Sequence, residues 1–257
     1  MPRGKYRSLV RLVSRNIMHT LVGSVDQRRF KTTLPAPGYY YLWDRSRGAI
    51  PRNPATAIGF DVNLKVVRRK RKGYDVFASV WADDTGNSHI EVEIHHNPNR
   101  KDHLSDMYYE LCGSIRHEIE HISDEGALAG LAPPQRNLVP HVPKWGKIVH
   151  TLNLRAKVFS ECYDSLDAWG REEVDRLNRS IDGNIFSYLT CYEEVGPITQ
   201  GIYYEAKKRR CTVDEVLVRY LDHLQAANAL NEAEYDEAYN HLIAWTKLTL
   251  PSARTFD

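Results

Sequence analysis

The segment Ser105-Asp-Met-Tyr-Tyr-Glu-Leu-Cys-Gly-Ser-Ile-Arg-His-Glu-Ile-Glu-His-Ile122 determines how the rest of the chain is interpreted. Its apolar residues Leu111, Ile115, Ile119 and Ile122 recur every three or four residues, which is the spacing of one buried helix face. Ser105 can cap the first turn. The pattern therefore predicts an amphipathic helix that runs through Ile122.

Three polar residues of this predicted helix, His117, Glu118 and His121, form the pattern H-E-x-x-H. Side chains four residues apart lie one above the other on a helix, so both imidazoles can bind one metal ion, and Glu118 leans toward the same space. Zn²⁺ suits such nitrogen ligands and keeps an open position for a water, whose pKa it lowers to about 7. Glu118 is then placed to act as general base. The alternative is a solvent-facing helix on which Glu118 and Glu120 offset nearby positive charges.

The residues before this helix predict strands. Segments 57–67, 74–81 and 89–95 are strand-like, with turns at Arg68–Gly73 and Asp83–Asn87 between them. Such short turns are typical of hairpins, so we expect an antiparallel meander. A strand edge beside the metal would let an extended peptide bind through backbone hydrogen bonds.

The remaining segments, before the strands and after the H-E-x-x-H helix, predict mainly helices. A first amphipathic helix is expected near residues 8–23 and a short strand near 39–43. The proline-rich connection 126–148 is longer than an ordinary loop, which favours a functional role. Two capping boxes, at Thr212 and Asn231, mark helix starts in the second half. The helices expected there are near residues 152–168, 170–181, 193–210, 213–227 and 232–247.

These elements predict a protein of the α+β class with two lobes. Residues 1–125 form a basic N-terminal lobe with an antiparallel sheet and the H-E-x-x-H helix, and residues 126–257 form a helical C-terminal lobe. The active site would lie in the cleft between them.

Composition and charge limit the function classes. Residues 1–104 hold 19 Lys and Arg against 9 Asp and Glu. This charge has two interpretations, attraction of nucleic acid or another acidic partner, and docking on the acidic lobe of the same chain. The basic run Arg68–Lys72 is expected to be a solvated turn.

No apolar run is long enough to span a membrane, and Arg11 and Arg15 interrupt any signal-peptide pattern. Four scattered cysteines fit a reducing compartment, so we expect a cytoplasmic protein.

Two segments of the chain resemble a known family. The pattern His117–His121, in a helix that follows a strand, resembles the zincin metallopeptidases. Residues 188–209, YLTCYEEVGPITQGIYYEAKKR, are similar to a segment of small proteins of tailed bacteriophages that are predicted to be metallopeptidases. The resemblance covers roughly residues 85–210. It implies a zincin-like fold, bound Zn²⁺, a peptide or protein substrate and, for a phage-encoded chain, a place in the host cytoplasm.

The resemblance also implies a third zinc ligand of the gluzincin kind, a glutamate early in a later helix. Glu194 is the first candidate and Glu193 the second. The longer signature with a third histidine is absent, since Asp124 and Ala127 occupy its last two defined positions. Weaker candidates are His141, His150, Asp124 and Glu161.

Gly196-Pro197 stands where the phage pattern has a Glu-Ala pair. Because proline disfavours a helix interior, we expect the helix to start nearer Pro197 and Glu194 to lie just ahead of its first turn.

A group that stabilises the oxyanion should lie near the metal. Five residues are chemically able, and the sequence does not choose among them: Tyr188, Tyr192, Tyr203, Tyr204 and His150. Tyr192, Tyr203 and His150 are taken as the candidates.

The leading hypothesis is therefore a zinc metallopeptidase with His117, His121 and Glu194 as ligands. The first alternative is a catalytically silent zincin-like scaffold or interaction protein, possible for a phage-associated chain. The second is a nucleic-acid-associated protein that uses the basic N-terminal lobe, which would bind with a steep dependence on salt.

Overall fold

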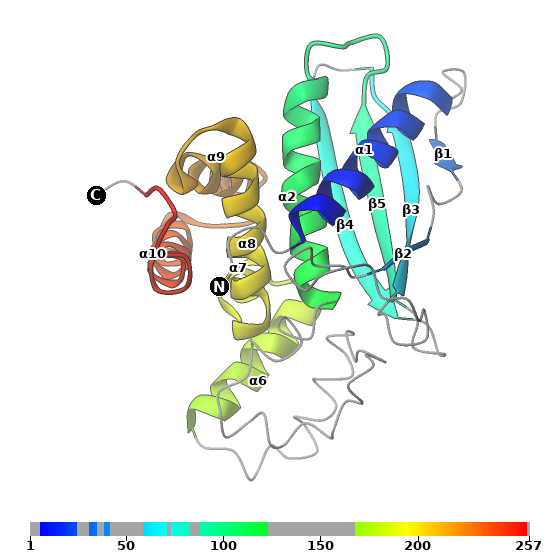
Figure 1. The fold of residues 1–257 in the computed structure, drawn as a ribbon. Helices are drawn as coiled ribbons and strands as arrows, with labels where there is room; N and C mark the ends of the chain where they lie inside the picture. The colour runs from blue at the N-terminus through cyan, green and yellow to red at the C-terminus, as the bar shows by residue number, and fades with distance from the viewer. Residues whose placement is uncertain are drawn as a thin grey trace.

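A mixed sheet and two groups of helices make up the protein (Figure 1). The structure, a computed structural model, describes residues 6–24, 31–34, 39–41, 59–70, 73–82, 88–122 and 168–255. Within these ranges the chain is α+β, as expected. The connection 126–148 and the helix expected near 152–168 lie outside the described residues.

The sheet has five strands in the described part of the chain, β1 (Lys31–Leu34), β2 (Tyr39–Tyr41), β3 (Gly59–Arg68), β4 (Tyr74–Ala82) and β5 (Ser88–His96). Their order is β1-β3-β5-β4, and β2 also pairs with β3. β5 is antiparallel to β4 but parallel to β3. The predicted antiparallel meander is therefore wrong, because β5 is inserted between β3 and β4.

A short turn between β3 and β4 does not require the two strands to be neighbours. Two strands that flank a third are about 9.6 Å apart, since neighbouring strands are about 4.8 Å apart. The five residues 69–73 can span about 16 Å when extended, so they can pass the end of β5. β5 is consequently an inner strand, and β4 is the strand at one edge of the described sheet.

Two helices cover one face of the sheet, α1 (Arg7–Ser24) and α2 (Leu104–Ile122). Alternate residues of each strand point toward them, which gives β5 its alternating burial. The resulting core contains fully buried residues from all of these elements: Val10, Val13 and Ile17 of α1, Phe60, Val62 and Leu64 of β3, Ile90, Val92 and Ile94 of β5, and Leu111, Ile115 and Ile119 of α2.

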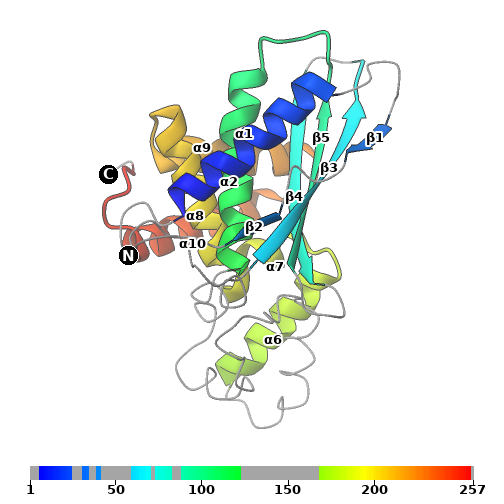
Figure 2. The same cartoon turned by 45° about the vertical axis from the view of Figure 1, so that its right-hand side comes forward.

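A second core lies among four of the later helices, α7 (Ile185–Thr190), α8 (Tyr192–Arg209), α9 (Val213–Ala226) and α10 (Glu232–Thr249). The helix before them, α6 (Ala168–Ile181), packs against α7. The capping boxes at Thr212 and Asn231 are both formed. The short helix α7 was not predicted. α8 packs along α2 and so joins the two cores (Figure 2).

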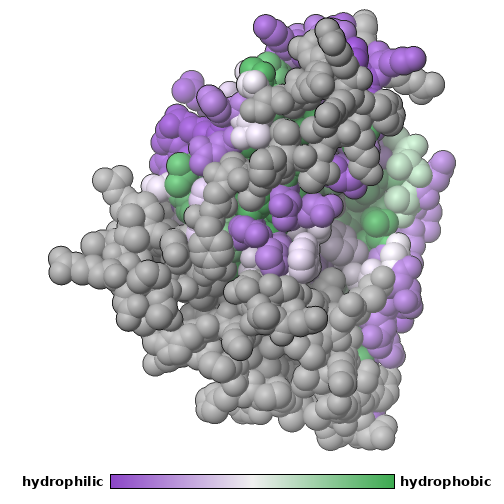
Figure 3. Space-filling view, turned by 90° about the vertical axis from the view of Figure 1, so that its right-hand side faces the viewer, coloured by the Kyte–Doolittle hydropathy of each residue, from purple (hydrophilic) through white to green (hydrophobic). Residues whose placement is uncertain are grey.

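The described surface is largely polar on the face shown in Figure 3, where hydrophilic side chains predominate and apolar ones gather in a few small areas. Among the described helices, none is both long and apolar enough to cross a membrane.

Candidate metal centre

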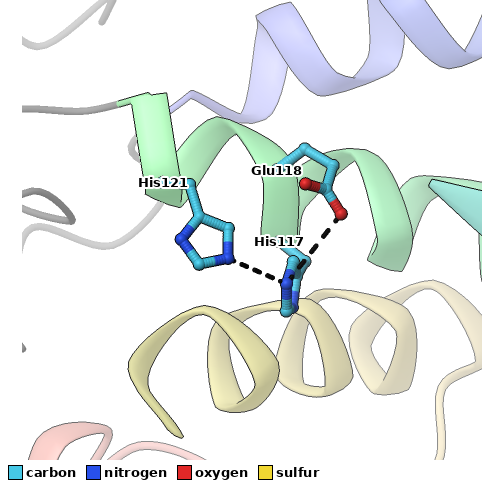
Figure 4. A group of neighbouring side chains, drawn as sticks. All are labelled: His117, Glu118 and His121. Carbon is cyan, nitrogen blue, oxygen red and sulfur yellow. Dashed lines mark hydrogen bonds and ion pairs between the residues drawn. The ribbon is translucent and has the colours of Figure 1, made fainter. Parts of the chain in front are cut away.

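The last two turns of α2 bring His117 and His121 together, as the four-residue spacing predicts. Their ring centroids are 4.8 Å apart and their planes are inclined at 68° in an edge-to-face arrangement. The two Nε2 atoms are 3.0 Å apart, and both rings point from α2 toward α8 (Figure 4).

Glu194 of α8 completes the group. Its Oε2 atom lies 3.3 Å from Nε2 of His117 and 3.2 Å from Nε2 of His121. The residue is only 2% exposed. Burial opposes ionisation of this carboxyl, but its electrostatic interactions and hydrogen bonds with His121 and His117 outweigh burial and hold its pKa well below the usual range. Glu194 is therefore a buried carboxylate.

The two Nε2 atoms of the histidines and Oε2 of Glu194 are arranged as a tetrahedral zinc site requires. Zinc binds imidazole nitrogen and carboxylate oxygen at about 2.0–2.1 Å, and two ligands at a tetrahedral angle are then about 3.3 Å apart. The observed separations of 3.0, 3.2 and 3.3 Å agree with this value. Two histidines and a glutamate are also a donor set that leaves zinc one open position. The residues present fit the ion.

α8 begins close to the start of the helix expected near 193–210 and well before Pro197, which explains how Glu194 reaches the histidines. The helix starts at Tyr192, and the N–H groups of Glu194 and Val195 both donate to the carbonyl of Cys191 at 3.1 Å. The expectation that the helix starts nearer Pro197 is wrong. Proline has a helical φ; at this place it removes the N–H that would pair with the carbonyl of Glu193 and its ring crowds that carbonyl, but neither effect prevents the helix from starting earlier. Glu194 thus belongs to the first turn of the helix.

A pair of glycines allows α8 to approach α2 closely. A Cβ on Gly201 would lie 2.9 Å from the carbonyl oxygen of Gly113, and a Cβ on Gly113 would lie 3.1 Å from the carbonyl oxygen of Gly201. The Gly201 position also lies 3.3 Å from Cβ of His117. Larger residues at this crossing would therefore move Glu194 away from the histidines.

Glu118 is a second carboxyl group beside the three atoms. It lies within 4.8 Å of both histidines, but its Oε1 atom is 3.9 Å from Nε2 of His117, so Glu194 is the closer oxygen. Burial, together with the charge of Glu194, raises the pKa of Glu118 to about 7, against the lowering effects of His117 and of a hydrogen bond from the backbone of Val80. Glu194 therefore faces both imidazoles, whereas Glu118 lies beside them.

Two tyrosines adjoin the group. The hydroxyl of Tyr188 in α7 lies 3.4 Å from Nε2 of His117. Burial, with the charge of Glu194, raises the pKa of Tyr188 well above its usual value, so the hydroxyl keeps its proton. Burial and the same carboxylate raise the pKa of Tyr220 in α9 to about 12.

The structure does not bring every candidate for the oxyanion role to the group of His117, His121 and Glu194. Tyr203 is nine residues after Glu194, which is the opposite side of the helix. Its hydroxyl lies 3.2 Å from Oγ of Ser252 and its ring lies under Lys207, so the structure does not bring it to the group. Tyr204 donates to the carbonyl of Arg7 instead. The tyrosine that does lie at the group, Tyr188, is on the helix that the sequence did not predict.

Several candidates lie where the structure gives no side-chain positions. The side chains of Tyr192 and Glu193 are outside the described atoms, and four weaker candidates are outside the described residues: Asp124, His141, His150 and Glu161.

A buried ion pair orients the same turns of α2. Arg116 and Glu120, 4% and 3% exposed, face each other with Nη1 and Oε2 2.5 Å apart. Arg116 also donates to Gln200 of α8 at 3.2 Å, and its guanidinium lies 5.7 Å from the ring centroid of Tyr6. These contacts fix the rotation of α2 against α8.

No family model matches this chain. Neither a curated protein nor a solved structure matches it either. The case for a function therefore depends on the site itself.

Proposed function

We propose that this protein is a zinc-dependent metallopeptidase in which His117, His121 and Glu194 hold Zn²⁺ and Glu118 is the general base. The proposal is carried by one observation, the triangle of two Nε2 atoms and one Oε2 atom with edges of 3.0, 3.2 and 3.3 Å. Three ligand atoms from two different helices meet there at the spacing of a tetrahedral zinc site.

Bound zinc would supply an acidified water and a Lewis acid for the carbonyl of a peptide bond. Glu118 stands beside His117 without belonging to the triangle, so its carboxylate is free to accept the proton of that water and to pass it to the leaving nitrogen. Its nearly complete burial strengthens this transfer, since a carboxylate kept from water is a stronger base.

The edge strand β4 is the proposed docking site for the substrate backbone. The backbone of Val80 gives a hydrogen bond to Glu118, so this edge of the sheet runs beside the base. In the described sheet β4 pairs with β5 alone. A peptide added to its other edge would be held in an extended form with its scissile bond near Glu118.

Tyr188 is the proposed stabiliser of the oxyanion. Its protonated hydroxyl lies 3.4 Å from Nε2 of His117, within reach of an atom bound beside that nitrogen. A neutral donor in a water-poor site can stabilise negative charge that develops on the carbonyl oxygen.

The first experiment measures zinc per chain by elemental analysis, and zinc affinity by competition with a chelating dye. We expect about one zinc in the wild type and an affinity loss of more than about 100-fold in His121→Ala and Glu194→Gln, because each removes a direct ligand. Glu237→Gln, which changes an exposed carboxylate of α10, should bind as the wild type does. A folded wild type that takes up no added zinc would refute the proposal.

The second experiment tests catalysis with a proteome-derived peptide mixture, read by mass spectrometry. Glu118→Gln should retain zinc and lose at least about 100-fold in cleavage rate, the usual contribution of a general base. A wild type that holds zinc and cleaves no peptide would favour the silent zinc-binding scaffold instead.

A further inference from the structure

A row of arginines lies along the outer side of α1. Arg7, Arg11 and Arg15 are spaced by four residues and so share one side of the helix. Arg7 and Arg15 are exposed and Arg11 is partly exposed. The opposite side of α1 is buried in the first core, so the row has a fixed outward direction.

Lys208 of α8 adds a fourth positive charge. Its ammonium nitrogen lies 5.3 Å from the ring centroid of Tyr204 and 5.8 Å from that of Tyr108. Burial lowers the pKa of Lys208, and the charges of the three arginines of α1 lower it further. The four cations therefore interact with one another across two helices.

No carboxylate within the described ranges forms an ion pair with any of these four residues. α1 itself contains no Asp or Glu between Arg7 and Ser24. The positive end of the helix dipole lies at its N-terminus, where the positive charge of Arg7 is unfavourable. Mutual repulsion and the dipole both act against this arrangement, so its charge does not serve the stability of the helix.

The N-terminal end of the helix that carries the row is anchored to the rest of the fold. The hydroxyl of Tyr204 donates to the carbonyl of Arg7 at 3.2 Å, and Tyr6, just before the helix, packs against Arg116 of α2. Figures 1 and 2 both show the N-terminal end of α1 close to α2 and α8. The backbone that carries the row is thus already in position before an anion binds.

We propose that Arg7, Arg11, Arg15 and Lys208 form a binding surface for the phosphodiester backbone of nucleic acid. The row from Arg7 to Arg15 is about 12 Å long, at 1.5 Å per residue, so it is extended like a phosphate chain rather than closed around one phosphate. Guanidinium groups pair with phosphate oxygens through two hydrogen bonds. An anionic membrane fits less well, since the apolar side of α1 is buried and its exposed large apolar residues, Leu12 and Val22, lie ten positions apart.

The test is fluorescence anisotropy with a labelled 20-base-pair duplex of mixed sequence, on the full chain at several salt concentrations. The variant Arg7→Gln/Arg11→Gln/Arg15→Gln should weaken binding at least about tenfold at low salt and reduce the slope of log K against log salt by about 3. The matched control Lys101→Gln/Lys247→Gln/Arg254→Gln removes the same charge from exposed positions on other segments. It should change binding less than about threefold.

Three outcomes would overturn the proposal. The duplex does not bind the wild type, or the control weakens binding as much as the row variant does, or phosphatidylserine vesicles bind while the duplex does not. Circular dichroism of each variant shows whether it is folded. If the triple variant is not folded, Arg11→Gln/Arg15→Gln replaces it, with an expected slope change of about 2. None of these readouts depends on zinc or on peptide cleavage.

Discussion

Gly201 of α8 lies so close to Gly113 of α2 that a Cβ on Gly201 would be 2.9 Å from the carbonyl oxygen of Gly113. The crossing of the two helices therefore sets the position of Glu194, two turns earlier in α8. A carbonyl oxygen of a helix backbone cannot move aside as a flexible side chain can. The close approach of the two glycines is therefore also required for Glu194 to lie beside His117 and His121.

The first prediction concerns Gly201→Ala, which should destabilise the fold by about 1–3 kcal/mol, as overpacking does, and weaken zinc binding. Gly196→Ala is the matched control in the same helix, because a Cβ there meets nothing within 4 Å. It should be neutral or stabilise by up to about 1 kcal/mol. Thermal unfolding and zinc titration measure both variants. Equal stability and equal zinc affinity for the two would show that the crossing tolerates a methyl group.

The second prediction concerns Tyr188→Phe, which removes only the hydroxyl near His117. If Tyr188 stabilises the oxyanion, kcat should fall by about 100-fold, with zinc content and KM little changed. Tyr220→Phe is the control, since it removes a second buried hydroxyl beside Glu194 with no described contact to His117, and its kcat should fall less than about threefold. A Tyr188→Phe enzyme with normal kcat would remove Tyr188 from the mechanism.

The third prediction is a pH dependence of stability that arises from Glu110. Burial, followed by the charge of Glu205, raises the pKa of Glu110 from 4.5 to about 7, while Tyr74 and Arg209 act in the opposite direction and Asp75 adds to the rise. The folded protein then holds a proton that the unfolded chain has lost between pH 4.5 and 7. The free energy of unfolding should therefore fall as the pH rises through this range.

Glu110→Gln should remove this loss of stability at higher pH, because the amide has no charge at any of these pH values. The variant should be more stable than the wild type by about 1 kcal/mol at pH 8, a value below the full linkage energy since Glu110 is partly exposed. The difference should vanish near pH 4. Glu91→Gln, at an exposed position of β5, is the control and should follow the wild type. Urea unfolding at several pH values would contradict the prediction if Glu110→Gln and wild type showed parallel profiles.

The fourth prediction concerns the buried pair Arg116 and Glu120. Arg116→Met should destabilise the protein by about 3–5 kcal/mol, because it leaves a carboxylate that is 3% exposed without its cation. Arg116→Met/Glu120→Leu should cost less than the single change, since no buried charge is left uncompensated. Denaturant unfolding of the two variants decides the point. A double variant less stable than the single one would mean that the ion pair itself stabilises the fold.

Local signals were sufficient to predict much of this structure. The spacing of His117 and His121 along one helix, and the capping boxes at Thr212 and Asn231, depend on residues within one or two turns. The α+β class follows from the same local patterns, since sheet and helix have different apolar periods. The proposed zinc chemistry remains a prediction, although the geometry now gives it three converging atoms.

Several features that depend on distant residues were not predicted correctly. The pairing of β5 with β3 joins Phe60 to Ser88, and no local turn encodes it. Pro197 pointed to a later start of α8, yet packing of α8 against α2 outweighs the loss of one hydrogen bond. Tyr188 could not be selected from the other tyrosines, because its place near His117 depends on how α7 packs.

The insertion of β5 between β3 and β4 has a consequence for folding kinetics. β4 and β5 can pair early because only five residues separate them in the chain, but β3 must wait until this pair has formed. β3 and β4 are equally near in the chain, so a direct pairing of these two strands would be a kinetic trap that must open before the native order forms. Pulsed hydrogen exchange should protect the amides of β4 and β5 before those of β3. Simultaneous protection of the three strands would mean that the sheet forms in one step.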